Sequence, residues 1–330
     1  MACATHSILV TGAAGFIGSA VAARLARMGH RVAGCDNFNH YYDPRLKDAR
    51  VAALLAPLGV PCIVAELADR AQVADLFART RPTHVVHLAA QAGVRHSLSE
   101  PAAYVQSNLV AFGHVLEACR NAGVGHLLYA SSSSVYGPAR RASCEQDETD
   151  QPHSLYAATK KANELMAHAY SHLYQLPATG MRLFTVYGPW GRPDMACFGF
   201  TEKILRGEPI ALFAAGRLRR DFTYIDDIVE SAVRLLFQPA AAAASAPHRV
   251  CNIGSDRPVR VLRFVRTLER VLGARARIEV QPMQPGDVAA THADTCRLRK
   301  WVDYQPSTPL ETGLGHFREW YNHWSTIRPV

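Results

Sequence analysis

Residues 7–19 read "SILVTGAAGFIGS" and carry the strongest structural signal in the sequence. A short apolar run is followed by Gly12, Gly15 and Gly18 in GxxGxxG spacing, and a helical pattern starts near Phe16. Glycines at a strand-to-helix turn permit a tight bend and let backbone N–H groups approach a pyrophosphate at the helix N-terminus. The position at the first strand-to-helix junction favours dinucleotide binding over a purely structural turn.

Outward from this stretch, apolar runs alternate with helical patterns over about the first 185 residues. Strands are predicted at 7–12, 31–36, 61–67, 83–90, 126–132 and 178–184, and helices near 16–28, 45–55, 72–80, 102–121 and 155–174. Such alternation predicts right-handed crossovers and a doubly wound parallel sheet. Beyond residue 187 the pattern is less regular. We therefore expect a cofactor domain of residues 1–187 with 222–254 returning to the sheet, and a substrate lobe of 188–221 and 255–330.

Composition excludes several classes of function. The 330-residue chain is 48% hydrophobic and carries a net charge of +8, without a block of like charges, which favours a small anionic substrate over nucleic acid. No apolar window is long enough to span a membrane, and no signal peptide is recognisable. The eight cysteines and fifteen histidines lack metal-ligand spacing, so we expect no metal, free thiols and a cytoplasmic location.

Asp36 ends the second predicted strand, 18 residues after Gly18. An acidic side chain at this place accepts hydrogen bonds from the adenosine ribose hydroxyls and repels a 2′-phosphate. The position therefore favours NAD over NADP. The alternative is an Asp that only stabilises the turn in "CDNFN".

Tyr156 and Lys160 lie four residues apart on a predicted helix, so both side chains project from one face. An ammonium beside a phenol favours the phenolate and lowers its pKa toward the working pH, which suits proton exchange with a sugar hydroxyl. The alternative is an exposed pair of no catalytic role.

The GxxGxxG turn, Asp36, "HLAAQ" at 87–91, the serines at 131–134 and the YxxxK pair together resemble the extended short-chain dehydrogenase/reductase family. The segments "DNFNHYYD", "AAQAGVR", "YASSSSVYG" and "YGPWGRPDMA" are similar to those of members that epimerise UDP-glucuronate at C4. The resemblance implies a Rossmann-type domain with a smaller C-terminal α/β lobe, tightly bound NAD, and a homodimer formed through helices near 102–121 and 155–174. It also implies interconversion of UDP-glucuronate and UDP-galacturonate through a 4-keto intermediate.

The same resemblance implies a role for individual residues. The catalytic group is Tyr156, Lys160 and Ser132. The cofactor contacts are Gly12, Gly15, Phe16, Ile17, Gly18, Asp36, Asn37, Asn39, Glu66, Leu67, Leu88, Ala89, Ala90, Gln91, Asn108, Tyr156, Lys160 and Tyr187. The substrate contacts are Ser133, Ser134, Thr185, Arg192, Arg220 and Asp287. Glu66 departs from relatives, which usually carry Asp there.

Ser133 and Ser134 decide the expected reaction. Related dehydratases resemble "TDEVYG" at this point and UDP-glucuronate decarboxylases resemble "TSEVYG", whereas this chain has no carboxylate there. Neutral hydroxyls can hold the carboxylate of a 4-keto sugar without repelling it. The alternatives are serines that only satisfy the strand end, a decarboxylase, a UDP-glucose 4-epimerase, or a non-catalytic NAD-binding sensor.

Overall fold

The computed structural model describes residues 5–138, 141–240, 246–284 and 287–327. The first part of the chain contains β1 Ser7–Thr11, α1 Phe16–Arg27, β2 Arg31–Asp36, α2 Arg45–Arg50, β3 Cys62–Val64, α3 Arg70–Thr80, β4 His84–His87, α4 His96–Ser99, α5 Pro101–Tyr104, α6 Ala111–Asn121 and β5 His126–Ser132. The middle part contains α7 Leu155–Tyr174, β6 Ala178–Leu183, β7 Thr185–Tyr187, α8 Ala196–Leu205, β8 Pro209–Phe213, β9 Arg219–Arg220, β10 Phe222–Tyr224 and α9 Ile225–Leu236. The last part contains β11 His248–Ile253, β12 Val259–Arg260, α10 Val261–Leu272, β13 Arg277–Gln281, α11 Cys296–Val302 and α12 Leu310–Ile327.

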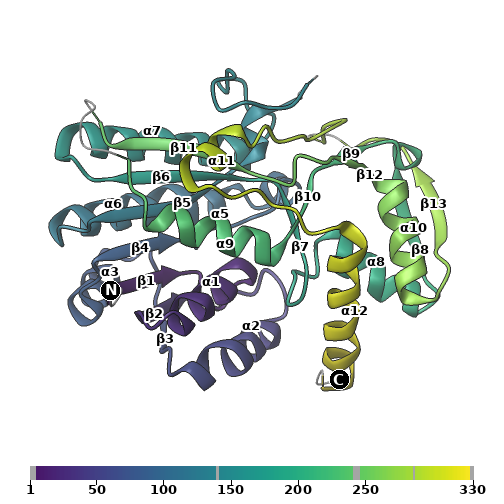
Figure 1. Ribbon diagram of the computed structural model, residues 1–330, viewed down its shortest axis with the longest axis horizontal. Coiled ribbons are helices and arrows are strands. Elements are labelled where there is room, and N and C mark those ends of the chain that lie inside the picture. The colour runs from purple at the N-terminus through teal and green to yellow at the C-terminus, as the bar shows by residue number, and fades with distance from the viewer. Residues whose placement is uncertain (1–4, 139–140, 241–245, 285–286, 328–330) are drawn as a thin grey trace.

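Among the described residues, seven parallel strands form the central sheet in the order β11-β6-β5-β4-β1-β2-β3 (Figure 1). Ser7 of β1 pairs with Arg31 of β2, and Ile8 pairs with His84 of β4. β1 therefore lies where the strand order reverses. In doubly wound sheets, ligands bind at this switch point, beyond the carboxyl ends of the strands. The doubly wound fold expected from the sequence is confirmed.

The strands are apolar on both faces because helices cover both faces. Val85 of β4 packs in the cluster beneath α3 and α6, while its neighbour Val86 packs in the cluster that includes α1 and α9. Leu127 and Leu128 of β5 divide in the same way. Side chains of successive strand residues point to opposite faces, so a continuous apolar run fills both cores.

Most segments after β7 build a smaller lobe beside the sheet, on the right in Figure 1, whereas α9, β11 and α11 lie with the sheet. In the lobe, β8 pairs with β13 and β9 with β12, and α8, α10 and α12 pack together. The chain passes between the sheet and this lobe at two places. At one, β10 pairs with β7, which follows β6; at the other, β11 pairs with β6 in the central sheet. The carboxyl edge of the sheet therefore faces the lobe.

Two helices predicted as continuous are interrupted by π-helical turns. The first is Val51–Leu55 after α2, and the second is Val105–Val110 between α5 and α6. π-Helical turns often mark functional positions because the wider turn redirects a side chain. The second turn carries Asn108, which is buried.

Candidate active site

A cavity opens at the carboxyl ends of the sheet strands and extends to the C-terminal lobe. Its lining includes all but two of the residues expected at the site. The expected residues that line the cavity are Gly12, Gly15, Phe16, Ile17, Gly18, Asp36, Asn37, Asn39, Glu66, Leu67, Leu88, Ala89, Ala90, Gln91, Ser132, Ser133, Ser134, Tyr156, Lys160, Thr185, Arg192, Arg220 and Asp287. The two exceptions are Asn108 and Tyr187.

The glycine turn leaves no room for side chains. Gly12 has φ +70°, and a Cβ there would lie 2.7 Å from the backbone N of Ala89. A Cβ on Gly15 would lie 2.9 Å from the carbonyl oxygen of Gly12, and one on Gly18 would overlap that oxygen. The glycines therefore permit a tight turn, and all three line the cavity at the start of α1, which fits the pyrophosphate of a dinucleotide.

Asp36 is held in place at the end of β2. Its Oδ1 accepts hydrogen bonds from the backbone N of Phe38 at 2.9 Å and from Lys47 Nζ at 3.1 Å. Lys47 also donates to Asn39 Oδ1 at 3.0 Å, and its side chain is buried. No hydrogen bond to Oδ2 is formed by the described residues, so this oxygen can accept from a ribose hydroxyl. The sequence analysis did not select Lys47.

Gln91 lies near the same end of the cavity. Its Oε1 accepts from Asn39 Nδ2 at 3.3 Å, whereas its Nε2 is buried without a hydrogen-bond partner in the described part of the chain. A buried amide donor without an acceptor is costly. This nitrogen is enclosed by protein, although other atoms of Gln91 line the cavity.

The catalytic candidates meet at the start of α7. Ser154 caps this helix by accepting from the backbone N of Ala157 at 3.1 Å, which fixes Tyr156 in the first turn. Burial raises the pKa of Tyr156, while a hydrogen bond with Ser132 and the charge of Arg192 oppose the rise. Ser132 and Tyr156 are therefore close enough for a proton to pass between their hydroxyls.

Lys160 lines the same cavity as Tyr156, and its expected effect on the pKa of Tyr156 stays a prediction. Its Nζ donates to the backbone oxygen of Ala130 at 2.9 Å, because the residue lies one turn along α7 and faces the end of β5. Burial lowers the pKa of Lys160 to about 8. The cation that opposes the raised pKa of Tyr156 is Arg192.

The four serines have different environments. Ser131 is buried and donates to Glu164 Oε1 at 2.6 Å. Ser132 caps a 3-10 turn, Ser133–Tyr136, by accepting from the backbone N of Ser134 at 3.2 Å, and its hydroxyl also donates to the Ser134 hydroxyl at 3.1 Å. The turn places three hydroxyls at the cavity wall without a carboxylate among them.

Glu164 lies behind this turn and is held by an arginine. Arg182 donates from Nε to Oε1 at 2.8 Å and from Nη2 to Oε2 at 2.7 Å, and both side chains are buried. The acidic residues in the cavity lining are Asp36, Glu66 and Asp287. Glu164 is not among them, so its carboxylate does not take the place of the missing acid.

Arg220 and Asp287 form an ion pair where the lobe meets the cavity. Arg220 Nη2 lies 2.5 Å from Asp287 Oδ1, and Arg95 from the β4 side lies 3.7 Å from Oδ2. The guanidinium of Arg95 also lies 4.7 Å from the ring centre of Phe213. Two cations thus meet at one carboxylate, which leaves a net positive charge suited to an anionic ligand.

Asn108 does not reach the cavity, which corrects the expectation from the sequence. Its Oδ1 accepts from the backbone N of Gln91 at 2.8 Å, and its Nδ2 donates to Gln91 O and to Thr159 Oγ1, both at 3.0 Å. Thr159 in turn donates to the backbone oxygen of Tyr156 at 2.8 Å. Asn108 therefore ties the loop after β4 to the catalytic helix.

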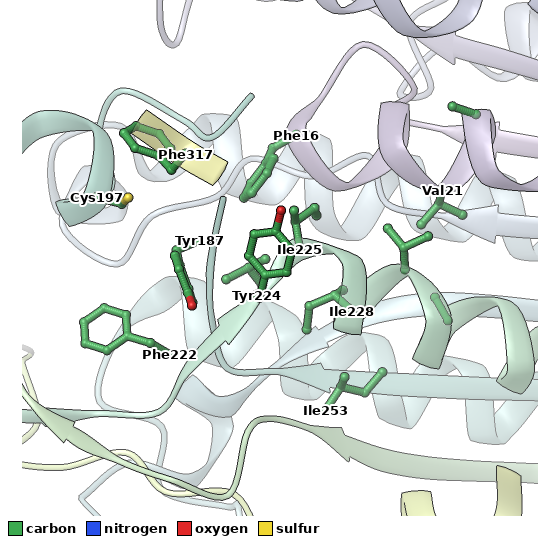
Figure 2. Packing of buried hydrophobic residues seen from close by; sticks show 14 of the residues in the cluster. Phe16, Val21, Tyr187, Cys197, Phe222, Tyr224, Ile225, Ile228, Ile253 and Phe317 are labelled. Atoms are coloured by element: carbon green, nitrogen blue, oxygen red, sulfur yellow. The ribbon is translucent and has the colours of Figure 1, made fainter. Parts of the chain in front are cut away.

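Tyr187 is also placed away from the cavity. Figure 2 shows its ring among Phe222, Tyr224 and other buried side chains, and its exposed fraction is 3%. The hydroxyl donates weakly to the backbone oxygen of Leu310 at 3.5 Å. The residue ends β7, whose pairing with β10 directs the ring into the core.

The sequence analysis did not select Arg50, which lies in α2. It is fully buried and donates to the backbone oxygens of Ala14, Trp190 and Gly191 at 2.8–3.2 Å, and to the Tyr42 hydroxyl at 2.6 Å. No carboxylate of the described residues forms an ion pair with it. Arg50 therefore connects the glycine turn to the loop that carries Arg192.

The described residues contain neither a membrane-spanning helix nor a cluster of metal ligands. None of the helices there combines the length and apolarity needed to cross a bilayer. Across the same residues, no group of three or more His, Cys, Asp or Glu side chains could hold a metal ion.

Comparison with known proteins gives concordant matches. A profile of the family described as "NAD dependent epimerase/dehydratase family" matches residues 8–254. The "Probable UDP-glucuronate 4-epimerase" of Rhizobium meliloti (strain 1021) is 46% identical over 328 residues, covering 95% of this chain and 96% of that protein. "UDP-glucuronate 4-epimerase 3" of Arabidopsis thaliana is 48% identical, covering 96% of this chain and 76% of that protein.

A solved structure is similar over almost the whole chain. It is the UDP-glucuronic acid 4-epimerase from Bacillus cereus in complex with UDP-glucuronic acid and NAD, which superposes with a TM-score of 0.88. The two chains are 31% identical, and the match covers 96% of this chain and 99% of that one.

Proposed function

This chain belongs to the NAD-dependent epimerase/dehydratase family, and on that premise we propose that it interconverts UDP-glucuronate and UDP-galacturonate at C4 of the sugar. The observation that carries the proposal is the wall formed by Ser132, Ser133 and Ser134 beside Tyr156, with no carboxylate in the turn. A proton-exchanging pair next to neutral hydroxyls suits oxidation at C4 with retention of the neighbouring carboxylate.

NAD, when bound, supplies a reversible acceptor for the C4 hydride. The glycine turn, Asp36 and Gln91 are the groups that would hold it. Tyr156, as phenolate, removes the proton from O4, and Ser132 holds that oxygen and passes the proton. The 4-keto sugar then turns within the cavity, and Tyr156 returns the proton to O4 when C4 is reduced on its opposite face.

Retention of the carboxylate depends on the serine turn. A 4-keto sugar with a carboxylate on C5 is a β-keto acid, and it loses CO₂ when the breaking bond aligns with the carbonyl π-system. Hydroxyls of Ser133, Ser134 and Thr185 can hold the carboxylate away from that alignment. An acid at these places would repel the anion or protonate the neighbouring carbon.

The two ends of the substrate meet different cations. Arg220, paired with Asp287, lies at the lobe and suits the pyrophosphate of the UDP group. Arg192 lies beside Tyr156 and suits the sugar carboxylate. This assignment orients the sugar toward the catalytic pair and the nucleotide toward the lobe.

The wider organisation is part of the proposal. We assign residues 1–187 and 222–254 to the cofactor domain and residues 188–221 and 255–330 to the UDP-sugar lobe, with support from the pairing of β11 with β6. A homodimer through these helices is supported by exposed apolar side chains on the Val105–Val110 turn and on α7. They are Val105, Leu165, Leu173 and Tyr174. The described cysteines are free, which suits the reducing cytoplasm.

The test is incubation of the purified protein with UDP-glucuronate, without added NAD, followed by proton NMR. The expected product is UDP-galacturonate, formed until both sugars reach equilibrium. UDP-xylose or its keto precursor would instead indicate a decarboxylase. Inertness toward UDP-glucuronate with turnover of UDP-glucose would reassign the substrate, and inertness toward both would favour a non-catalytic binding protein.

A further inference from the structure

Arg192 is held by a carboxylate of its own loop. Its Nε donates to Asp194 Oδ1 at 2.9 Å and its Nη2 donates to Asp194 Oδ2 at 2.6 Å, so the pair is bidentate. A planar guanidinium bonded along one edge cannot rotate freely. Nη2 also contacts Met195 Sδ, a weak acceptor, at 3.8 Å. Nη1 donates to no described residue, so the edge that carries Nη1 remains for a ligand in the cavity.

A second segment, far away in the sequence, holds the carboxylate. Tyr41, in the loop after β2, donates its hydroxyl to Asp194 Oδ2 at 3.1 Å, and its ring centre lies 5.9 Å from the Arg192 guanidinium. Burial would raise the pKa of Asp194, but Arg192 and Tyr41 outweigh it and keep that pKa below its usual value. The pair is therefore ionised at neutral pH.

The backbone beneath the pair is fixed as well. Trp190 has a left-handed backbone with φ +64°, and the buried Arg50 donates to the carbonyl oxygens of Trp190 and Gly191. These anchors lie one and two residues before Arg192. Both the main chain and the side chain of Arg192 are thus restrained from the cofactor domain.

We propose that Asp194, held by Tyr41, is a positioning residue that aims the free edge of Arg192 at the sugar carboxylate and thereby sets the preference for an acidic over a neutral UDP-sugar. The inference rests on the proposed function, since it assigns the sugar carboxylate to Arg192. Asp194 itself touches neither the reacting carbon nor its oxygen in this scheme.

The physical basis is preorganisation. A free arginine side chain must lose rotamer freedom when it binds an anion, whereas the Asp194 pair restrains it beforehand. An amide at position 194 would offer one acceptor and one donor. Its oxygen would keep the two bonds now made to Oδ2, so the donor would face Arg192 Nε. Asp194→Asn therefore breaks half of the bidentate contact with little change in side-chain size.

The experiment compares two nucleotides on the NAD-loaded protein. Dissociation constants of UDP-glucuronate and UDP-glucose are measured by calorimetry in a Tyr156→Phe background, where turnover does not interfere. We expect Asp194→Asn to weaken UDP-glucuronate about tenfold and to change UDP-glucose less than twofold. Tyr41→Phe should act in the same direction with a smaller effect, and Asp75→Asn, which breaks an exposed Arg–Asp pair on α3, should change neither constant.

Equal weakening of both nucleotides by Asp194→Asn would overturn the inference, because it would indicate a general structural role. Tighter binding of UDP-glucuronate would also overturn it, since Asp194 would then be a competitor for Arg192. The same titrations separate this inference from the proposed function. If the parent enzyme fails to epimerise UDP-glucuronate, the function falls, while the selectivity ratio still tests the role of Asp194.

Discussion

The buried pair of Glu164 and Arg182 offers a sharp prediction about the serine turn. In Glu164→Gln, the amide oxygen can keep both bonds now made to Oε1, from the Ser131 hydroxyl and from Arg182 Nε. The amide nitrogen then faces Arg182 Nη2, which at present donates to Oε2 at 2.7 Å. One charge-assisted hydrogen bond is replaced by two opposed donors, and the Arg182 cation is left buried without an anion.

Removing one partner of a buried pair costs about 3–5 kcal/mol. Because two of the three bonds can survive, we expect the lower end, about 3 kcal/mol. With an unfolding entropy of about 2.1 cal/mol/K per residue, this corresponds to a fall in Tm of about 4 °C. The double variant Glu164→Met with Arg182→Met removes both charges and should recover at least half of the loss.

Thermal unfolding followed by circular dichroism measures the fall in Tm, and proton NMR measures the share of each reaction product. The double variant removes the acceptor of the Ser131 hydroxyl and should disturb the adjoining serines, so we expect a detectable share of decarboxylated product from it and not from Glu164→Gln. The reasoning would be refuted by a Tm change below 1 °C in the single variant. A double variant less stable than either single one would refute it as well.

Further predictions concern the cofactor turn, the catalytic pair and two buried histidines. Gly18→Ala should purify without stoichiometric NAD, because its Cβ would overlap the oxygen of Gly12. The bound NAD is measured by absorbance after denaturation, and full occupancy by NAD would contradict the proposed site. Tyr156→Phe should lower kcat at least ~100-fold while retaining NAD, and unchanged turnover would exclude Tyr156 as the base. His87 and His126 are buried, with pKa values lowered by burial to about 3 and about 4. Since the unfolded chain takes up these protons below about pH 6.5, stability should fall by about 1.4 kcal/mol per pH unit for each as pH decreases toward 4, and denaturant titrations showing no loss would contradict this.

The sequence predicted the parts of the site that depend on residues close together in the chain. The glycine turn, Asp36 and the Tyr156–Lys160 spacing each depend on a few adjacent positions, and the structure brings them to one cavity. Strand and helix positions followed from apolar runs of distinct period. The orientation of Lys160 toward Ala130 could not be read from spacing, because it depends on how α7 crosses β5.

The residues that were missed act through contacts outside their own helix. Lys47 lies 11 residues from Asp36, and Arg50 lies 140 residues from Trp190. On a helical wheel both resemble solvent-exposed cations, and only the tertiary packing buries them. The prediction for Tyr187 was wrong because β7 directs its side chain into the core, although the preceding residue, Val186, lines the cavity.

Arg50 also bears on how such enzymes can be recombined. Its donors end on backbone oxygens of two regions, the turn at Ala14 and the loop at Trp190 and Gly191, so no side-chain substitution in either region can replace the contacts. A chimera that takes its C-terminal lobe from a relative must therefore reproduce the backbone path of that loop. If it does not, the Arg50 guanidinium is left buried without acceptors where the two domains meet. We therefore expect such a hybrid to lose folding before it loses catalysis.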